Sequence, residues 1–408
     1  MSEWKKVKLG EICERVTSGG TPKANVSSYY NPPTIPWLKT KEVNYCRITE
    51  TENYISEEGL KNSSAKLISP NSVIIAMYGQ GDTAGRIAIN KIPLATNQAC
   101  CNLTIDKSKA DYEFIYYQLC TLYDKLVSLK AGAAQPNLNA RIIKNLEIIM
   151  PSLPIQYCIA NILSRYDSLI ENYQKQIKLL GEAAQRLYKE WFIDLHFPGH
   201  ENTKIVDGVP EGWERKKISD VCTMIGAGST PSRRNNAYWD DGNIRWVKTK
   251  ELLDNWIFDT EEYITEEGLN NSSTKMFPVN TILMAIYASP TLGRLGILAQ
   301  ECCCNQAALG LVANEKLISW VWLYLKLFEL RDEFNAVARG AGQQNISGVV
   351  VKNWEITVPN KKTIEDFAKM AKPYFENAKS LQSQLRLLTE ARDRLLPKLM
   401  SGEINVES

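Results

Sequence analysis

The chain has 408 residues, of which 44% are hydrophobic and 23% charged, and its formal net charge at pH 7 is +2. This length has room for two or three domains, each large enough to bury a core. The charge balance excludes binding to nucleic acid through bulk charge: residues 1–150 carry 18 Lys+Arg against 14 Asp+Glu, and residues 210–360 carry 15 against 18. A nucleic-acid site would therefore have to come from local clusters.

The sequence also bears on location and metal content. Its longest apolar runs, such as 73–78 and 317–325, are too short to cross a membrane. The charged amino terminus has no signal peptide, and the ten cysteines include no CxxC pair. We therefore expect a cytoplasmic protein without a zinc site, in which Cys13 and Cys222 are buried free thiols.

Each half of the chain predicts a mixed α/β domain. The first half predicts a strand over 8–16, a glycine-rich turn over 18–22 and a short helix that begins at Glu57 after the cap Ser56. A strand over 73–78, a helix over 111–129, a Gly-Ala-Gln loop over 131–139 and a final strand over 142–150 follow. In the second half, Thr265 is the matching helix cap. A strand over 281–287, a helix over 318–337, a loop over 339–347 and a final strand over 349–358 follow. Residues 196–212 contain Pro and Gly residues that are typical of a linker.

The similarity between the halves is an internal repeat. WLKTKE at 37–42 recurs as WVKTKE at 246–251, and YISEEGLKNSSAK at 54–66 recurs as YITEEGLNNSSTK at 263–275, both at an offset of 209. From Gly85 onward the offset is 208, so that Asn97-Gln98-Ala99 recurs as Asn305-Gln306-Ala307. The repeat predicts two homologous domains, each followed by a long helix.

The two long helices are predicted over 155–192 and 364–399, where apolar residues recur every three or four positions. At 1.5 Å per residue the first would be about 55 Å long. One interpretation is an ordinary core helix. The length favours the other, a coiled coil in which the two apolar stripes pack against each other. Pro373 should kink the second helix or begin a new one there.

The sequence contains no convincing catalytic set. Asn31-Pro32-Pro33 resembles the motif by which amino-methyltransferases hold adenine, but Thr34 follows in place of an aromatic residue, and the second half has Asp240-Asp241-Gly242 there. Gly226-Ala227-Gly228 is not followed by Gly-Lys-Ser/Thr, which a phosphate-binding loop requires. A self-sufficient adenine methyltransferase is therefore an alternative without an active-site motif, and a scaffold that binds only proteins is a second alternative.

Polar residues in predicted loops are the remaining candidates for a site, because Lys and Arg neutralise phosphates while Arg, Asn and Gln read bases. Solvated lysines and turn-capping amides are the alternative interpretation. We expect Asn97 and Gln98 to be structural, since they sit between apolar segments. The first-half candidates are Thr21, Lys23, Lys39, Lys41, Arg86, Gln135 and Asn137. The second-half candidates are Thr230, Arg233, Arg234, Lys248, Lys250, Arg294, Gln343, Gln344 and Asn345.

Together these motifs resemble the specificity (S) subunit of Type I restriction-modification systems. The resemblance covers essentially the whole chain and is carried by SGGTP at 18–22, GSTP at 228–231, the two EEGL-x-NSS blocks, TNQAC at 96–100, LYKEWFIDLHFPG at 187–199, VPEGW at 209–213 and LLPKLMSGEI at 395–404. It implies an α+β chain with two target-recognition domains, separated by two antiparallel coiled-coil helices and related by a pseudo-twofold. Each domain would read one half of a split, asymmetric DNA target.

The resemblance also implies partners and domain limits. Two methyltransferase subunits, using S-adenosylmethionine, and restriction subunits would bind this chain, which itself would be non-catalytic and need no cofactor. Tyr188, Lys189 and Phe192 are our candidates for docking a methyltransferase subunit. We expect the first domain at 1–153, the first helix at 154–195, a linker at 196–212, the second domain at 213–361, and the second helix with the tail at 362–408.

Overall fold

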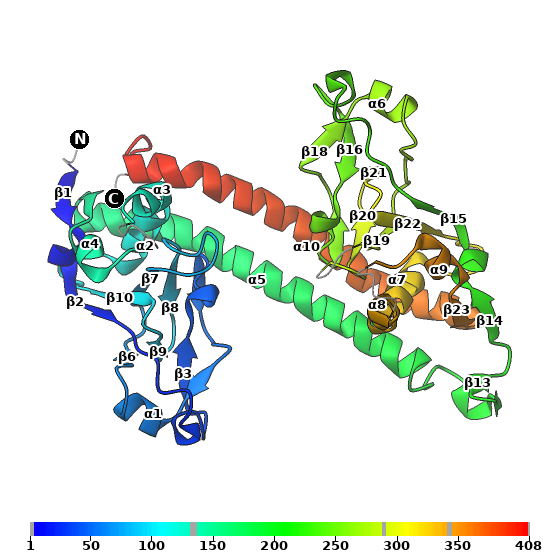
Figure 1. Ribbon diagram of the computed structural model, residues 1–408, viewed down its shortest axis with the longest axis horizontal. Coiled ribbons are helices and arrows are strands. Elements are labelled where there is room, and N and C mark those ends of the chain that lie inside the picture. The colour runs from blue at the N-terminus through cyan, green and yellow to red at the C-terminus, as the bar shows by residue number, and fades with distance from the viewer. Residues whose placement is uncertain (1–3, 131–136, 288–290, 341–344, 407–408) are drawn as a thin grey trace. The chain divides into compact units, whose positions relative to one another are not determined.

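The computed structural model describes residues 4–130, 137–287, 291–340 and 345–406. The chain divides into two compact units (Figure 1). Unit 1 comprises Met1–Ile170 and Leu388–Ser408, and unit 2 comprises Glu171–Leu387. Each unit therefore contains part of both long helices, α5 (Leu153–Phe192) and α10 (Lys361–Ser401).

Unit 1 is a mixed α/β unit. Besides its parts of α5 and α10 it contains, in chain order, β1 (Lys5–Lys8), η1 (Leu9–Ile12), β2 (Cys13–Ser18), η2 (Ser27–Tyr29), β3 (Ile35–Leu38), η3 (Thr40–Glu42), β4 (Cys46–Ile48), β5 (Tyr54–Ile55), α1 (Glu57–Lys61), β6 (Leu67–Ile68), β7 (Val73–Ala76), β8 (Ile87–Asn90), β9 (Leu94–Thr96), β10 (Cys100–Ile105), α2 (Tyr112–Cys120), α3 (Tyr123–Ser128), α4 (Ala140–Lys144) and β11 (Glu147–Met150).

Unit 2 repeats most of this order after the linker. Its elements are η4 (His200–Asn202), β12 (Ile205–Val206), β13 (Val209–Pro210), β14 (Glu214–Lys217), η5 (Ile218–Val221), β15 (Cys222–Ala227), η6 (Asn236–Tyr238), β16 (Ile244–Val247), η7 (Thr249–Glu251), β17 (Asn255–Ile257), β18 (Glu262–Ile264), α6 (Glu266–Asn270), β19 (Ile282–Ala285), β20 (Leu295–Leu298), β21 (Cys303–Cys304), β22 (Ala308–Ala313), α7 (Trp320–Glu329), α8 (Arg331–Gly340), α9 (Gly348–Asn353) and β23 (Glu355–Val358).

A five-stranded sheet forms the centre of each unit. Its order is β2-β10-β7-β8-β4 in unit 1 and β15-β22-β19-β20-β17 in unit 2. The register is also repeated, since Ala76 pairs with Cys100 and Ala285 with Ala308. The change of offset from 209 to 208 therefore falls between β7 and β8, where the second unit is one residue shorter.

The central strand of each sheet buries both faces, which explains why the sequences VIIA and ILMA are apolar throughout. In unit 1, Val73 and Ile75 pack with α2, α4, α5 and the end of α10, while Ile74 and Ala76 face the small sheet β5-β3-β9-β6. Figure 1 shows α1 and β3 at one end of this unit and α2 and α4 at the other. The unit is thus a helical layer, a sheet and a second, smaller sheet.

Sequence-predicted elements are confirmed where the apolar pattern is simple. Ser56 and Thr265 cap α1 and α6, and their hydroxyls accept hydrogen bonds from the Gly59 and Gly268 N–H groups at 3.0 and 3.1 Å. The strands over 73–78 and 281–287 are present as β7 and β19. The long helices are present as α5 and α10, and α10 runs as one helix through Pro373, so no new helix begins there. Buried Ala371 and Phe375 hold this turn against the core and offset the missing backbone hydrogen bond.

Other predictions were wrong in their boundaries. The opening strand over 8–16 is broken by η1, and the helices over 111–129 and 318–337 are each two helices, α2 with α3 and α7 with α8. Thr121 ends α2, because its hydroxyl donates to the Gln118 carbonyl at 2.8 Å. The first parts of the strands over 142–150 and 349–358 are helices α4 and α9, which Asn139 and Ser347 cap.

The cysteines of the described chain are free. Cys13 and Cys222 are partly rather than fully buried, which corrects our expectation. Burial nevertheless raises the pKa of both thiols to about 12, so the reactive thiolate is scarce at neutral pH. Within the described ranges no helix is both long and apolar enough to span a membrane.

One buried carboxylate, that of Asp167 on α5, joins four elements of unit 1. It accepts hydrogen bonds from Arg47 on β4 at 2.8 Å, from the Tyr117 hydroxyl on α2 at 2.5 Å and from Arg392 on α10 at 2.9 Å. The Asp167 and Arg47 side chains are each 7% exposed. Burial raises the pKa of Tyr117, so its hydroxyl keeps its proton and remains a donor. The carboxylate therefore ties both long helices to the sheet.

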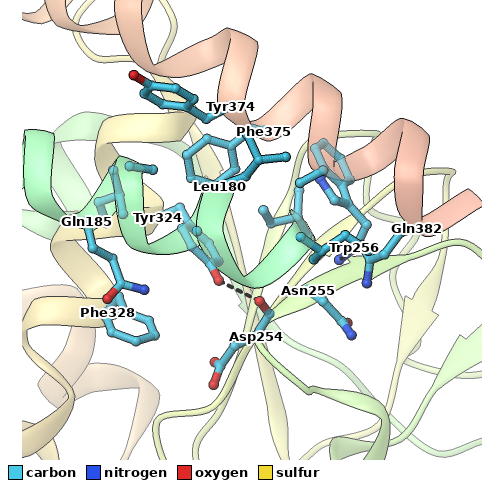
Figure 2. A pocket seen from close by; sticks show the side chains of 16 residues that line it. Leu180, Gln185, Asp254, Asn255, Trp256, Tyr324, Phe328, Tyr374, Phe375 and Gln382 are labelled. Atoms are coloured by element: carbon cyan, nitrogen blue, oxygen red, sulfur yellow. Dashed lines mark hydrogen bonds between the residues drawn. The ribbon is translucent and has the colours of Figure 1, made fainter. Parts of the chain in front are cut away.

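In unit 2, apolar residues occupy the positions that correspond to the Asp167 ion pairs of unit 1. The internal repeat puts Phe375 at the position of Asp167, Trp256 at that of Arg47 and Ala184 at that of Arg392. Trp320 packs edge-on against both Trp256 and Phe375, with ring centroids 5.4 Å apart in each case. Because Ala184 and Gly181 are small, a cavity of about 100 Å³ remains beside them. Figure 2 shows Trp256, Tyr324 and Phe375 around it, with the Tyr324 hydroxyl donating to the Asp254 carbonyl at 3.0 Å.

We expect Asp167→Asn to lower the free energy of unfolding by about 3 kcal/mol, because it removes the buried carboxylate that pairs with the buried Arg47 guanidinium at 2.8 Å and with the partly exposed Arg392 guanidinium at 2.9 Å. Urea denaturation followed by circular dichroism measures this loss. Asp393→Asn is the matched control: Asp393 also pairs with Arg392, at 2.7 Å, but is 56% exposed, so the change should stay within about 0.5 kcal/mol. Equal losses in the two variants would contradict the role assigned to burial.

Candidate nucleic-acid interface

Three chain segments meet where the central strand of each sheet ends. In unit 1, the Met77 N–H donates to the Ala99 carbonyl at 2.7 Å, and the Leu138 N–H donates to the Met77 carbonyl at 3.0 Å. In unit 2, Ile286 makes the same two bonds with Ala307 and Ile346, both at 2.9 Å. Gln98 and Asn137, and likewise Gln306 and Asn345, are thus brought to one strand end by backbone hydrogen bonds.

The glycine-rich turn is fastened to the same place. The Gly19 and Gly20 N–H groups donate to the Cys100 and Thr96 carbonyls at 3.2 and 2.8 Å. A Cβ atom on Gly19 would lie 2.1 Å from the Thr96 carbonyl oxygen, so only glycine allows this approach. The turn therefore presents Thr21 beside Gln98.

A threonine–glutamine contact follows in both units. The Thr21 hydroxyl donates to the Gln98 side-chain oxygen, and the Thr230 hydroxyl donates to that of Gln306 at 2.5 Å. Both glutamine side chains are exposed. The prediction that Asn97 and Gln98 are structural agrees with their intramolecular contacts, since Asn97 accepts from the Cys100 thiol at 3.3 Å and Gln98 accepts from the Thr21 hydroxyl. Gln98 is nevertheless exposed, which the sequence did not indicate.

An arginine directly before the next strand, β8 or β20, completes the group. The Ala76 N–H donates to the Arg86 carbonyl and the Ala285 N–H to that of Arg294, each at 2.9 Å. Arg86 pairs with Asp82 at 2.6 Å, and this hydrogen bond lowers the pKa of Asp82, so the carboxylate stays ionised. Among the described residues, Arg294 pairs with no carboxylate. We call the resulting group in each unit the edge row: Thr21, Arg86, Gln98 and Asn137 in unit 1, and Thr230, Arg294, Gln306 and Asn345 in unit 2.

The predicted lysines flank the edge row and differ in their pairing. Lys39 follows Leu38, whose carbonyl accepts from the Asn97 N–H at 2.9 Å, and its ammonium contacts the neutral amide of Asn53 at 2.9 Å. The matching Lys248 is held between two carboxylates, Glu262 at 2.8 Å and Glu261 at 3.1 Å. A hydrogen bond with Glu262 raises the pKa of Lys248. Its charge is therefore largely neutralised within the protein.

The remaining candidates are distributed around these lysines. Lys41 pairs with Glu52, and Lys250 pairs with Glu261 at 2.6 Å. Arg233 is exposed, pairs with Glu262 and stacks over the Trp239 ring at 3.5 Å, while Lys23 and Arg234 are exposed in the turns. Sequence reasoning missed Trp239, although it stands at the repeat position of Tyr30. Gln135, Gln343 and Gln344 lie outside the described residues.

The residues expected to dock a partner lie mostly in the core of unit 2. Tyr188 is 4% exposed, and its hydroxyl donates to Glu329 at 2.5 Å. Phe192 packs against Phe367 and Trp322. Only Lys189 is largely exposed, and it pairs with Asp194 at 2.6 Å. Tyr188 therefore offers almost no surface to a partner, while Phe192 is partly buried.

A duplicated α/β fold that presents the same polar row twice defines a protein with two related binding units. The chain matches the family model described as the Type I restriction modification DNA specificity domain over residues 1–180 and 210–386, and it belongs to that family. The family and the α+β fold class expected from the sequence are thereby confirmed. The role of the chain is DNA recognition within a Type I restriction-modification system.

Individual proteins agree with this assignment. The chain is 29% identical to the specificity subunit of the Type I restriction enzyme MjaIX of Methanocaldococcus jannaschii, over 99% of this chain and 94% of that one. It is 22% identical to the HindI specificity subunit of Haemophilus influenzae, over 99% and 100% of the two chains. The crystal structure of the S subunit from M. genitalium has the same fold, with a TM-score of 0.65 at 16% identity over 98% of this chain and 96% of that one.

We expect Lys39→Ala to reduce the salt dependence of DNA binding, because no carboxylate among the described residues pairs with the Lys39 ammonium, which is thus available to a phosphate. The slope of log K against log salt concentration should become shallower by about 0.9, the value for one lost phosphate contact. Lys248→Ala, at the matching repeat position, should change the slope less, because Glu261 and Glu262 already pair with the Lys248 ammonium. Fluorescence anisotropy of a labelled duplex across a salt series distinguishes them, and equal slopes would show that Glu261 and Glu262 do not neutralise Lys248.

Proposed function

We propose that each unit reads one half of a bipartite DNA target and that the two half-sites differ. The observation that carries this proposal is the presence of the same edge row in both units beside loops that differ. Lys23 is replaced by Ser232 and Pro136 by Gln344, and the turn that leads to Arg294 is one residue shorter than the one that leads to Arg86. Since base readout depends on side chains and loop shape, different loops favour an asymmetric target.

The proposed contacts with DNA combine the edge rows with their flanking residues. In unit 1 they are Thr21, Lys23, Lys39, Lys41, Arg86, Gln98, Gln135 and Asn137. In unit 2 they are Thr230, Arg233, Arg234, Lys248, Lys250, Arg294, Gln306, Gln343, Gln344 and Asn345. The ion pairs of five of these residues would have to open or be shared when DNA phosphates approach: Lys41, Arg86, Arg233, Lys248 and Lys250.

We propose that α5 and α10 set the distance between the two half-sites. Their 40 and 41 residues correspond to lengths of about 60 Å at 1.5 Å per residue. One turn of duplex DNA is roughly 34–36 Å, so helices of this length suit half-sites separated by non-contacted base pairs. The number of those base pairs would follow the length of the helices.

The proposed partners are duplex DNA, two methyltransferase subunits and, in the full complex, restriction subunits. We propose that the methyltransferase subunits supply S-adenosylmethionine chemistry and that this chain has no catalytic step and no cofactor of its own. These partners would place it in the cytoplasm. The two alternatives are distinguished directly: adenine methylation by the purified chain alone would favour a self-sufficient methyltransferase, and absence of DNA binding by the chain together with its methyltransferase would favour a protein-only scaffold.

Replacing Gln343, Gln344 and Asn345 together by alanine should abolish recognition of one half-site and leave binding to the methyltransferase intact. The loss of recognition is expected from the two glutamines, which precede Asn345 in the sequence and of which Gln344 stands at the repeat position of Pro136. Methylome sequencing of cells that carry the variant measures the surviving target, and co-purification measures partner binding. If partner binding is lost instead, these residues shape the fold rather than read DNA.

Inserting one heptad into each long helix should lengthen the spacer and preserve both half-site sequences. The insertion points are between Ile170 and Glu171 in α5 and between Leu387 and Leu388 in α10, where each helix passes from one compact unit to the other. Seven residues add about 10.5 Å, or roughly three base pairs. Target mapping by methylome sequencing provides the measurement, and an active variant with an unchanged spacer would rule out the helices as a ruler.

A further inference from the structure

The edge rows of the two units are identical in residue type, although an asymmetric target presents different bases to each unit. Thr, Arg, Gln and Asn recur at the four matching positions, whereas neighbouring positions differ, for example Ala24 against Arg233. We propose that the edge row holds the sugar-phosphate backbone of each half-site and that bases are read outside it. This inference rests on the proposed function. Within the same site it assigns backbone contacts to the edge row and base contacts to the neighbouring residues.

The contact between threonine and glutamine gives the edge row its chemistry. An amide oxygen that accepts a hydroxyl proton turns the two N–H donors of the same amide away from the threonine. In both units this glutamine is exposed, so the donors are available to an acceptor outside the protein. Phosphate oxygens accept hydrogen bonds from Gln, Asn, Thr and Arg side chains at any DNA sequence. Thr21 and Thr230 act as positioning residues for Gln98 and Gln306.

Main-chain geometry fixes this arrangement in each unit. A Cβ on Gly228 would lie 2.0 Å from the Cys304 carbonyl oxygen, as a Cβ on Gly19 would lie 2.1 Å from that of Thr96. The turns are therefore pressed against the strands that precede Gln306 and Gln98. Because the donors are held in place before DNA binds, little conformational freedom is lost on contact. A pre-organised row suits a ligand of constant shape, and the DNA backbone is the part of the target that does not vary.

The differing positions lie next to the row. The Arg233 side chain stacks on Trp239 and pairs with Glu262, while the matching residue in unit 1 is Ala24 and the matching aromatic is Tyr30. The turn between β19 and β20 is also one residue shorter than that between β7 and β8. These differences supply unit-specific contacts, which the edge row does not.

The test compares Gln306→Ala with Arg233→Ala, each in the full chain together with its methyltransferase subunits. We expect Gln306→Ala to weaken binding to target and non-target duplexes by the same factor, about tenfold, and to leave the methylated sequence unchanged. Arg233→Ala, which creates the residue found in unit 1, should alter the sequence requirement of one half-site. Relaxed base preference in Gln306→Ala, or unchanged affinity, would overturn the inference.

A second pair of variants tests the positioning role. Thr230→Val removes the hydroxyl and should lower the affinity about as much as Gln306→Ala, whereas Thr230→Ser keeps the hydroxyl and should restore it. The urea midpoint of each variant shows whether the fold is intact, and full affinity in a folded Thr230→Val variant would overturn the role. If instead neither Arg233→Ala nor replacement of Gln343 and Gln344 by alanine changes the methylated sequence, the proposed reading function fails, independently of the edge row.

Discussion

Within unit 1, the carboxylate of Asp167 holds together segments that are far apart in the sequence. Its partners Arg47 and Tyr117 belong to the α/β unit, and Arg392 lies more than 200 residues further on in α10. Unit 1 is therefore complete only when the end of the chain has been made. A charge buried to this extent is stable only with all its partners in place, so the interaction specifies one arrangement of the helices and the sheet.

Unit 2 satisfies the same requirement with apolar packing. Phe375 and Trp256 occupy the repeat positions of Asp167 and Arg47, and Trp320 bridges them through edge-on aromatic contacts. The two solutions are not interchangeable, because Phe375 offers no carboxylate at the position of Asp167, and Asp254, which lines the cavity, is already paired with Arg331. Small Ala184 and Gly181 leave a cavity there, whereas the same positions in the repeat are Arg392 and Thr389 (Figure 2). The two repeats thus share a fold, while the contacts between the long helices and the sheet are ionic in unit 1 and apolar in unit 2.

The position of the edge row in each unit depends on backbone hydrogen bonds rather than on side-chain interactions. Met77 and Ile286 join three segments by main-chain hydrogen bonds, so the positions of Gln98, Asn137 and their counterparts do not depend on which bases the loops read. Loops attached to such a scaffold can change length and sequence without moving the edge row. Specificity can therefore change in one unit and leave the other intact.

The sequence alone determined the duplication, the two long helices, the helix caps at Ser56 and Thr265, and the family, because each depends on local pattern or on residues that recur in order. It could not determine that α4 and α9 begin the segments expected to be strands, since a short apolar run suits either structure until its cap and its neighbours are known. It also could not determine the environments of Gln98 and Tyr188. The exposure of the first is decided by a strand end and a tight glycine turn, and the burial of the second by aromatic residues contributed by distant parts of unit 2. Only the tertiary structure could decide which side of a helix or turn faces the core, because that depends on segments brought together by folding.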